Sequence, residues 1–174
     1  MATATNERAN RDWIATEFSK GIDAEQSLID VGKTRVEAPP DSTLMVLYQE
    51  IANADTRHKQ IVETIATRYG HTPSRGVTGS IGETLGRLKD KVGEMGASGI
   101  QLLGSDLAAK ANAIHWYTAW VAAFEALGDT ESGSELAAVM IEEKAHRDAL
   151  QTALNRLITL GARVIGSDPT IPKS

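Results

Sequence analysis

Prolines divide this chain into long intervals that contain no helix breaker. The five prolines are Pro39, Pro40, Pro73, Pro169 and Pro172. Proline removes a backbone hydrogen-bond donor and clashes with the preceding helical turn, so it rarely occurs inside a helix. Long intervals without proline are typical of long helices. The distribution therefore predicts an all-α protein.

Apolar residues recur at the helical period of 3.6 residues in four parts of the chain. We expect helices over about residues 11–38, 43–70, 100–127 and 132–160. Residues that typically cap helices lie at the ends of these segments. They are Asn10 or Asp12 before the first, Asp41 and Ser42 before the second, Gly70 after it, Gly128 after the third, and Ser132 and Gly161 around the fourth.

The linkers indicate how these helices are connected. The loop at Pro39 is short, so the first two helices should form an antiparallel hairpin. A glycine-rich crossover with a marginal amphipathic helix, residues 71–98, separates them from the last two helices. We therefore predict a left-handed antiparallel four-helix bundle over residues 11–160, between flexible tails at residues 1–10 and 161–174.

Charged residues interrupt the apolar rows of three of these helices. Glu25 lies on the row of the first helix. Asp55 and His58 fill a gap in the row of the second helix, and Glu143 and His146 lie on the row of the fourth. A carboxylate and an imidazole three residues apart share one face of a helix, which is how helical bundles hold a metal. These residues are therefore the candidate metal ligands.

The helix order and these motifs resemble the ferritin-like superfamily. The segment Glu125-Ala126-Leu127-Gly128-Asp129, followed by Glu142-Glu143-Lys144-Ala145-His146, is similar to small bacterial ferritin-like stress proteins related to rubrerythrin. In that family each hairpin brings a glutamate on its first helix and a Glu-x-x-His on its second, and the two halves hold two irons. The resemblance implies a metal site formed by Glu25, Asp55, His58, Glu143 and His146.

The third helix departs from the family pattern. At the depth where the resemblance places a glutamate, its buried row contains Lys110 and Ile114. The nearest acidic residue is Asp106, one turn from Lys110. The resemblance therefore implies a single-metal site or a degenerate two-metal site with an incomplete ligand set.

Two interpretations of Lys110 are open. If its ammonium lies in the site, it can neutralise the buried carboxylates in place of a metal, because buried charges must be paired. If it pairs with Asp106 at the edge of the seam, the candidate ligands surround one metal ion, or two held loosely. Two histidines with carboxylates suit iron, manganese or zinc, and the sequence does not choose among them.

Composition excludes several other classes of protein. The chain has no cysteine, which excludes disulfides, thiolate metal sites and cysteine nucleophiles. It has 18 basic and 23 acidic residues, a net charge of −5 and no long basic run, which argues against a nucleic-acid partner. It has no apolar signal-peptide segment and no apolar run of about 18 residues, so we expect no membrane helix and a cytoplasmic location.

The third helix is apolar nearly all round, so the crossover or a second subunit should cover part of it, and we expect a homodimer through this helix. His115 is a packing residue or a substitute ligand beside its row, and Tyr117 is a phenol near the site. The leading function is a stress-associated metal-binding protein that handles iron or peroxide. The alternative is a metal-free structural or interaction bundle. The sequence identifies no small-molecule substrate and does not decide whether the protein is an enzyme.

Overall fold

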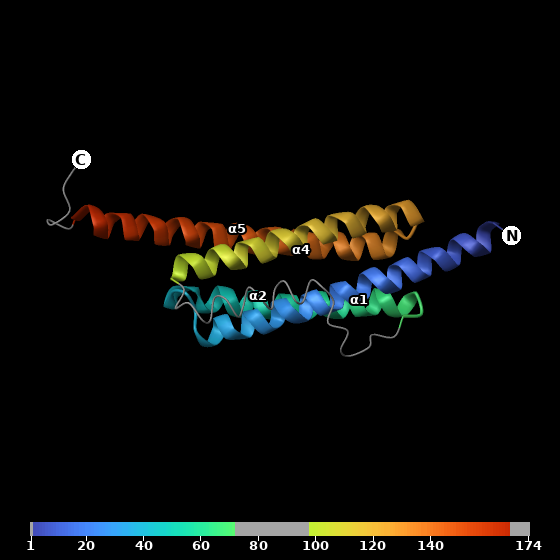
Figure 1. The fold of residues 1–174 in the computed structure, drawn as a ribbon, viewed down its shortest axis with the longest axis horizontal. Coiled ribbons are helices and arrows are strands. Elements are labelled where there is room, and N and C mark those ends of the chain that lie inside the picture. Colours follow the sequence, from blue (N-terminus) through green and yellow to red (C-terminus); the bar gives the residue numbers. More distant parts are fainter. Residues whose placement is uncertain (1, 72–97, 168–174) are drawn as a thin grey trace.

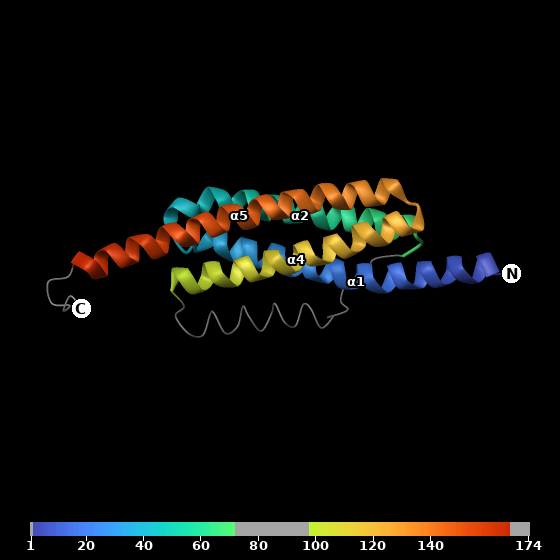
Figure 2. The same ribbon diagram turned by 90° about the horizontal axis from the view of Figure 1, so that it is seen from above.

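Two helical hairpins form the described part of the protein. The computed structural model describes residues 2–71 and 98–167, and the helix predicted within the crossover lies outside them. The elements are α1 (Ala2–Glu37), the 3-10 helix η1 (Ser42–Leu44), α2 (Met45–Arg68), α4 (Gly99–Leu127) and α5 (Thr130–Ser167). Helix α1 packs against α2 and α4 against α5, while contacts between α2 and α5 join the hairpins (Figure 1, Figure 2). The predicted all-α four-helix bundle is confirmed.

Two helices extend beyond the ends that their sequence patterns predict. Helix α1 begins at Ala2 rather than after Asn10 or Asp12, because residues 2–10 contain no proline that would stop the helix. Helix α5 continues through Gly161 to Ser167. A single glycine inside a helix costs only about 1 kcal/mol relative to alanine, so the adjacent turns carry the helix past it. The predicted start of α1 and the predicted stop at Gly161 are therefore wrong.

The turn between α4 and α5 is capped on both sides. Gly128 adopts the left-handed conformation with a φ of 77° and ends α4 as predicted. The Asp129 carboxylate accepts hydrogen bonds from the Ser132 backbone N–H at 3.0 Å and from the Ser132 hydroxyl at 2.6 Å. Helix α5 therefore begins at Thr130, and Asp129 takes the capping role that the sequence pattern assigned to Ser132.

A layer of charged side chains crosses the bundle between two hydrophobic clusters. One cluster includes the aromatic residues Phe18, Trp120 and Phe124. The other includes Tyr48 and Leu150. The buried members of the layer, which we call the charged layer, are Glu25, Asp55, His58, Lys110 and Glu143. The apolar clusters shield this layer from water at both ends, which strengthens every electrostatic interaction within it.

Gly21 allows α1 to pack closely against the Trp120 ring of α4. A Cβ at Gly21 would lie 2.3 Å from Cη2 of Trp120. We predict that Gly21→Ala lowers the free energy of unfolding by about 1–3 kcal/mol, because the ring must shift inside a packed core. Gly104 is the matched control, since a Cβ there would meet no atom of the described residues within 4 Å, and Gly104→Ala should stabilise α4 by up to about 1 kcal/mol. Urea denaturation of both variants measures the difference, and equal changes would contradict the close packing.

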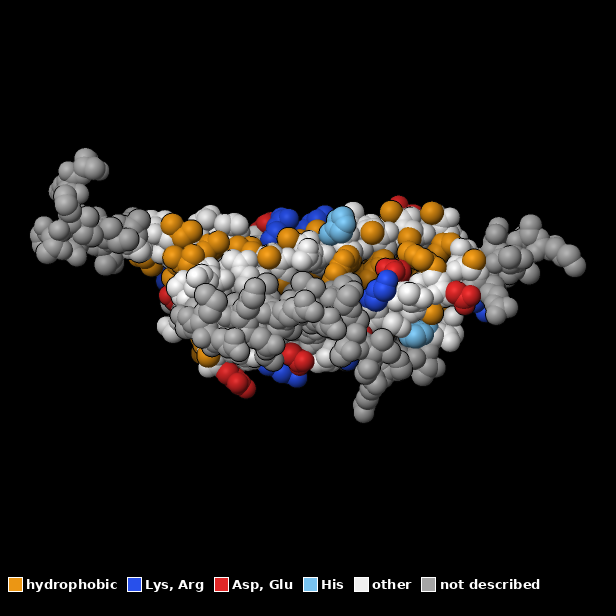
Figure 3. All heavy atoms as spheres, viewed as in Figure 1, with side chains coloured by type: hydrophobic (Ala, Val, Ile, Leu, Met, Phe, Trp, Pro, Cys, Tyr) orange, Lys and Arg blue, Asp and Glu red, His pale blue; other side chains and the backbone are white. Residues whose placement is uncertain are grey.

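The outward face of α4 carries little charge. Among its residues before Phe124, the charged ones are Asp106 and Lys110, and both are buried. Hydrophobic side chains gather along α4 and α5 on the face shown in Figure 3. The homodimer through this helix stays a prediction. None of the described helices has an apolar stretch long enough to cross a membrane.

Candidate metal centre

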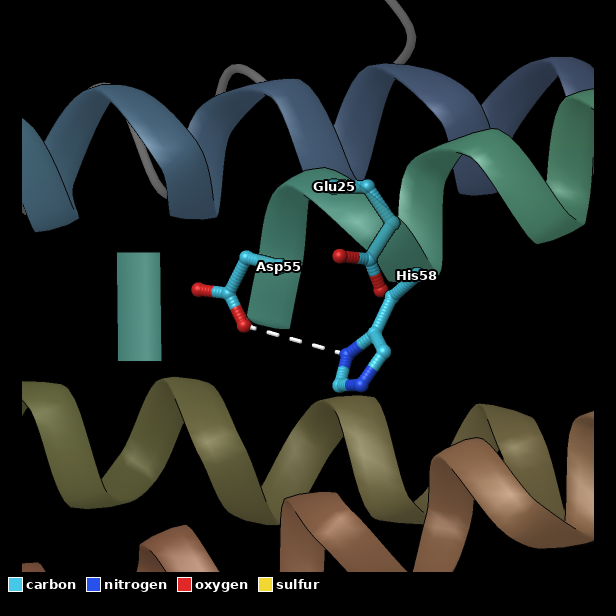
Figure 4. A group of neighbouring side chains, drawn as sticks. All are labelled: Glu25, Asp55 and His58. Carbon is cyan, nitrogen blue, oxygen red and sulfur yellow. Dashed lines mark ion pairs between the residues drawn. The ribbon is translucent and has the colours of Figure 1, made fainter. Parts of the chain in front are cut away.

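The structure brings the predicted ligands together from three helices. Glu25 comes from α1, Asp55 and His58 from α2, and Glu143 from α5. These four side chains are at most 3% exposed, so water has almost no access to them. Figure 4 shows Glu25, Asp55 and His58 pointing from the first hairpin into the space between the hairpins. His146 joins them from α5 as a half-buried residue.

These residues form two groups, each with ligand atoms close enough to hold one ion. In the first group, Glu25, Asp55 and His58 each offer a ligand atom, and these atoms lie within 4.8 Å of one another. In the second group, Asp55, Glu143 and His146 do the same. Because Asp55 belongs to both groups, the arrangement has the form of two adjacent metal positions that share a carboxylate.

Lys110 lies within the second group. Its Nζ donates hydrogen bonds to Asp55 Oδ1 at 2.5 Å and to Glu143 Oε1 at 2.9 Å. The interpretation that places its ammonium in the site is confirmed, and the one that pairs it with Asp106 is wrong. The ammonium therefore takes a place in which an ion bound to both carboxylates would lie.

Asp106 is instead held by two residues of the first hairpin. Arg35 donates from Nε to Oδ2 at 2.9 Å and from Nη2 to Oδ1 at 3.1 Å. The Tyr48 hydroxyl donates to Oδ2 at 2.6 Å. All three residues are buried, and we call them the Asp106 network. Since this network binds both oxygens of Asp106, Lys110 extends toward the other carboxylates.

Tyr117 and His115 differ in their relation to the site. The Tyr117 hydroxyl donates a hydrogen bond to Glu25 Oε1 at 2.6 Å, so the phenol lies beside the site as predicted. His115 is exposed on α4 and belongs to neither group of ligand atoms. Among the described residues, the geometry therefore gives His115 no ligand role.

The His58 ring bridges a buried and a surface carboxylate. Its Nδ1 lies 3.0 Å from Glu143 Oε1, and its Nε2 lies 3.1 Å from Glu142 Oε2. Glu142 was not among the predicted site residues, because it lies outside the apolar row of α5 and its side chain is 47% exposed. Its position directly before Glu143 is the signal that could have identified it.

Burial favours the neutral form of two carboxyl groups. Together with the charges of Asp55 and Glu143, it raises the pKa of Glu25 to about 8. Burial also raises the pKa of Asp55 to about 6, although the Lys110 ammonium opposes this shift. At neutral pH, Glu25 therefore holds a proton while Asp55 is mostly ionised.

Hydrogen bonds favour the charged forms of three other groups. Burial opposes charge on Glu143, but hydrogen bonds from His58 and Lys110 outweigh it and lower the pKa to about 2. Burial likewise opposes charge on His58 and Lys110, and the neighbouring carboxylates outweigh it and raise both pKa values. Burial and the Lys110 charge lower the pKa of His146. Without metal, the layer can thus balance two carboxylates against one ammonium and one imidazolium.

Three buried atoms of the site have no hydrogen-bond partner among the described residues. They are Glu25 Oε2, Glu143 Oε2 and His146 Nδ1. Buried polar atoms normally have partners, and all three are of the kind that bind metal ions. These atoms therefore fit a cation site. The first group is the better place for the ion, because the Lys110 ammonium would repel a cation in the second.

The fold can be compared with that of known proteins. An antiparallel four-helix bundle with carboxylates and histidines in its core is the architecture of the ferritin-like proteins. The structure is similar to bacterioferritin BfrA of Mycobacterium tuberculosis, with a TM-score of 0.67 and 16% sequence identity, and the match covers 87% of this chain and 89% of that chain. The sequence matches no protein-family model and no curated protein. The chain therefore has the ferritin-like fold that its helix order and motifs predict.

Proposed function

We propose that this protein is a ferritin-like metal-binding protein that holds one divalent metal ion per chain. The ligands are Glu25, Asp55 and His58, with Glu143 beside them. Lys110 fills the place that a second ion would take. The hydrogen bonds from Lys110 Nζ to both Asp55 and Glu143 are the observation that supports this proposal most directly.

The charge balance of the layer favours one ion over two. When the three carboxyl groups of the layer are ionised and His58 is neutral, as metal binding requires, there are three negative charges. The Lys110 ammonium compensates one of them and leaves two. One divalent ion neutralises them, whereas two ions would leave a net positive charge in a buried layer, which is costly. When one ion binds, it displaces the protons of Glu25 and His58, so the layer is neutral both with and without metal.

The ligand types indicate the class of metal. Carboxylate oxygens with an imidazole suit iron, manganese or zinc, and the similarity to a bacterioferritin makes iron the first candidate. A bound ion would supply a Lewis acid, and iron or manganese also a redox centre. The residues of this chain hold that ion and exclude water from it. A stress-associated role in handling iron or peroxide, in the cytoplasm, is part of the same proposal.

One observation favours a second candidate, a metal-free structural or interaction bundle. Both ring nitrogens of His58 already lie beside carboxylates, and Lys110 already pairs with two. The charged layer is therefore held together by its own side chains. In this alternative, the ion pairs specify how the two hairpins pack, and no metal binds.

Binding of one ion should stabilise the folded protein. A ligand that binds only the folded state raises the free energy of unfolding, by about 2.7 kcal/mol at a hundredfold excess over its dissociation constant. We expect this increase in urea denaturation with Mn²⁺, with Zn²⁺ or, without oxygen, with Fe²⁺. Glu25→Gln should abolish most of it, because the amide keeps an acceptor for the Tyr117 hydroxyl but loses the charge.

Glu50→Gln is the matched control, because Glu50 is an exposed residue of α2. This variant should respond to metal as the wild type does. If none of the three ions stabilises the wild type, the one-ion proposal fails and the metal-free bundle stands. If Glu25→Gln is stabilised as much as the wild type, Glu25 is not a ligand.

A further inference from the structure

The ring of His58 is held from outside the charged layer as well as from inside it. The ring is almost fully buried, with 1% of its side chain exposed, whereas the Glu142 side chain that meets its Nε2 is 47% exposed. Arg57 fixes this carboxylate, because its Nη2 donates to the same oxygen, Oε2, at 2.9 Å. Arg57 and Glu142 belong to different hairpins, so the contact also joins α2 to α5.

This contact determines which ring nitrogen faces the site. A carboxylate paired with a guanidinium accepts hydrogen bonds and does not donate them, so the Nε2 of His58 must carry a hydrogen. Without metal, Nδ1 also carries a hydrogen, because it points toward the ionised Glu143 carboxylate. When a metal ion replaces that hydrogen, the ring keeps its hydrogen on Nε2 and binds the ion through Nδ1. Metal-binding histidines commonly donate their other N–H to a carboxylate in this way, which fixes both the tautomer and the orientation of the ring.

The other hairpin offers an internal comparison. Glu142 directly precedes the carboxylate Glu143, and the equivalent position before Asp55 is Ala54, which has no polar side chain. On α5, the half-buried His146 has no partner for its Nδ1 among the described residues. The histidine of the first group therefore has a carboxylate that orients it. For the histidine of the second group, where Lys110 lies, the equivalent position holds no carboxylate.

We propose that Glu142 is a positioning residue that orients His58 toward a metal ion in the first group, and that the second group lacks this support. The inference rests on the one-ion function proposed above. It adds a residue that is not a ligand, and it gives an independent reason why the first group holds the ion. Glu142 touches His58 rather than the ion, so it acts through the ring.

The test compares Glu142→Ala with Glu142→Gln by metal titration and by nitrogen-15 NMR of the His58 ring in the protein saturated with Zn²⁺. Loss of a residue that orients a metal-binding histidine typically weakens metal affinity by about 10- to 100-fold, and we expect this loss for Zn²⁺ or Mn²⁺ in Glu142→Ala. With Zn²⁺ bound, the wild-type spectrum should show one ring state, with hydrogen on Nε2 and the ion on Nδ1, and Glu142→Ala should lose this single state. Glu142→Gln should keep both properties, because its amide oxygen can still accept from Nε2.

Lys144→Ala is the matched control, since Lys144 is an exposed neighbour on α5, and it should behave as the wild type. Unchanged metal affinity in Glu142→Ala, or an unchanged His58 tautomer, overturns the positioning role and leaves the one-ion function intact. A wild type that binds neither ion overturns the one-ion function, and the role of Glu142 toward a metal with it. The two failures are therefore distinguishable.

Discussion

Lys110→Glu is expected to bind two divalent ions per chain where the wild type binds one, and to be much less stable than the wild type without metal. The substitution removes an ammonium that donates to Asp55 and Glu143. It also places a carboxylate on α4 at the position where the ferritin-like pattern has a glutamate. Both groups of ligand atoms would then be open to a cation.

Without metal, the variant leaves buried carboxylates with no ammonium to pair with. Breaking a buried ion pair costs about 3–5 kcal/mol, so urea denaturation should show a loss of this size that added divalent ion restores. Lys144→Glu is the control, because Lys144 is exposed and a surface change usually alters stability by less than about 0.5 kcal/mol. A Lys110→Glu protein that binds no more metal than the wild type would show that Lys110 does not replace a metal ion.

Asp106→Ala should lower the free energy of unfolding by about 3–5 kcal/mol, because it leaves a buried guanidinium without its partner. The Arg35 side chain is only 10% exposed and would lose two hydrogen bonds from one substitution. The buried Tyr48 hydroxyl would lose its acceptor at the same time. Chemical denaturation measures the loss.

The surface pair between Arg147 and Asp148 is the control for Asp106→Ala. Their side chains are 40% and 67% exposed, so Asp148→Ala should cost at most about 1 kcal/mol. Metal binding by Asp106→Ala should stay at one ion per chain, because Lys110 pairs with Asp55 and Glu143 instead. Equal losses in the two variants would contradict the importance of the Asp106 network, and a changed ion count would contradict its independence from the metal centre.

The helices and the burial of the candidate ligands could be predicted because both follow from local periodicity. Glu25, Asp55 and Glu143 interrupt apolar rows. The period of each row indicates which residues are buried and how far along the helix they lie. His58 and His146 follow their carboxylates by three residues, which is enough to place each pair on one face of a helix. The ends of α1 and α5 were less predictable, because a single capping residue or glycine carries little free energy compared with the turns around it.

The position of Lys110 could not be predicted because it depends on a distant residue. From the sequence, Asp106 and Asp55 were equally reasonable partners for the ammonium. The choice follows from Arg35, which lies 71 positions from Asp106 and binds both of its oxygens. Glu142 was missed for a similar reason. It is a surface residue on its own helix and acquires its role only from the His58 ring of the other hairpin.

The number of divalent ions bound per wild-type chain tests the central claim most directly. Metal-free protein would be equilibrated with excess Mn²⁺, Zn²⁺ or, without oxygen, Fe²⁺, freed of unbound metal, and measured by elemental analysis against protein concentration. The charged layer, with three carboxyl groups and one ammonium, predicts one ion per chain. Two ions per chain would show that metal displaces the Lys110 ammonium. No bound ion in any of the three experiments would show that the side chains of the layer replace the metal altogether. Either result would contradict the one-ion proposal.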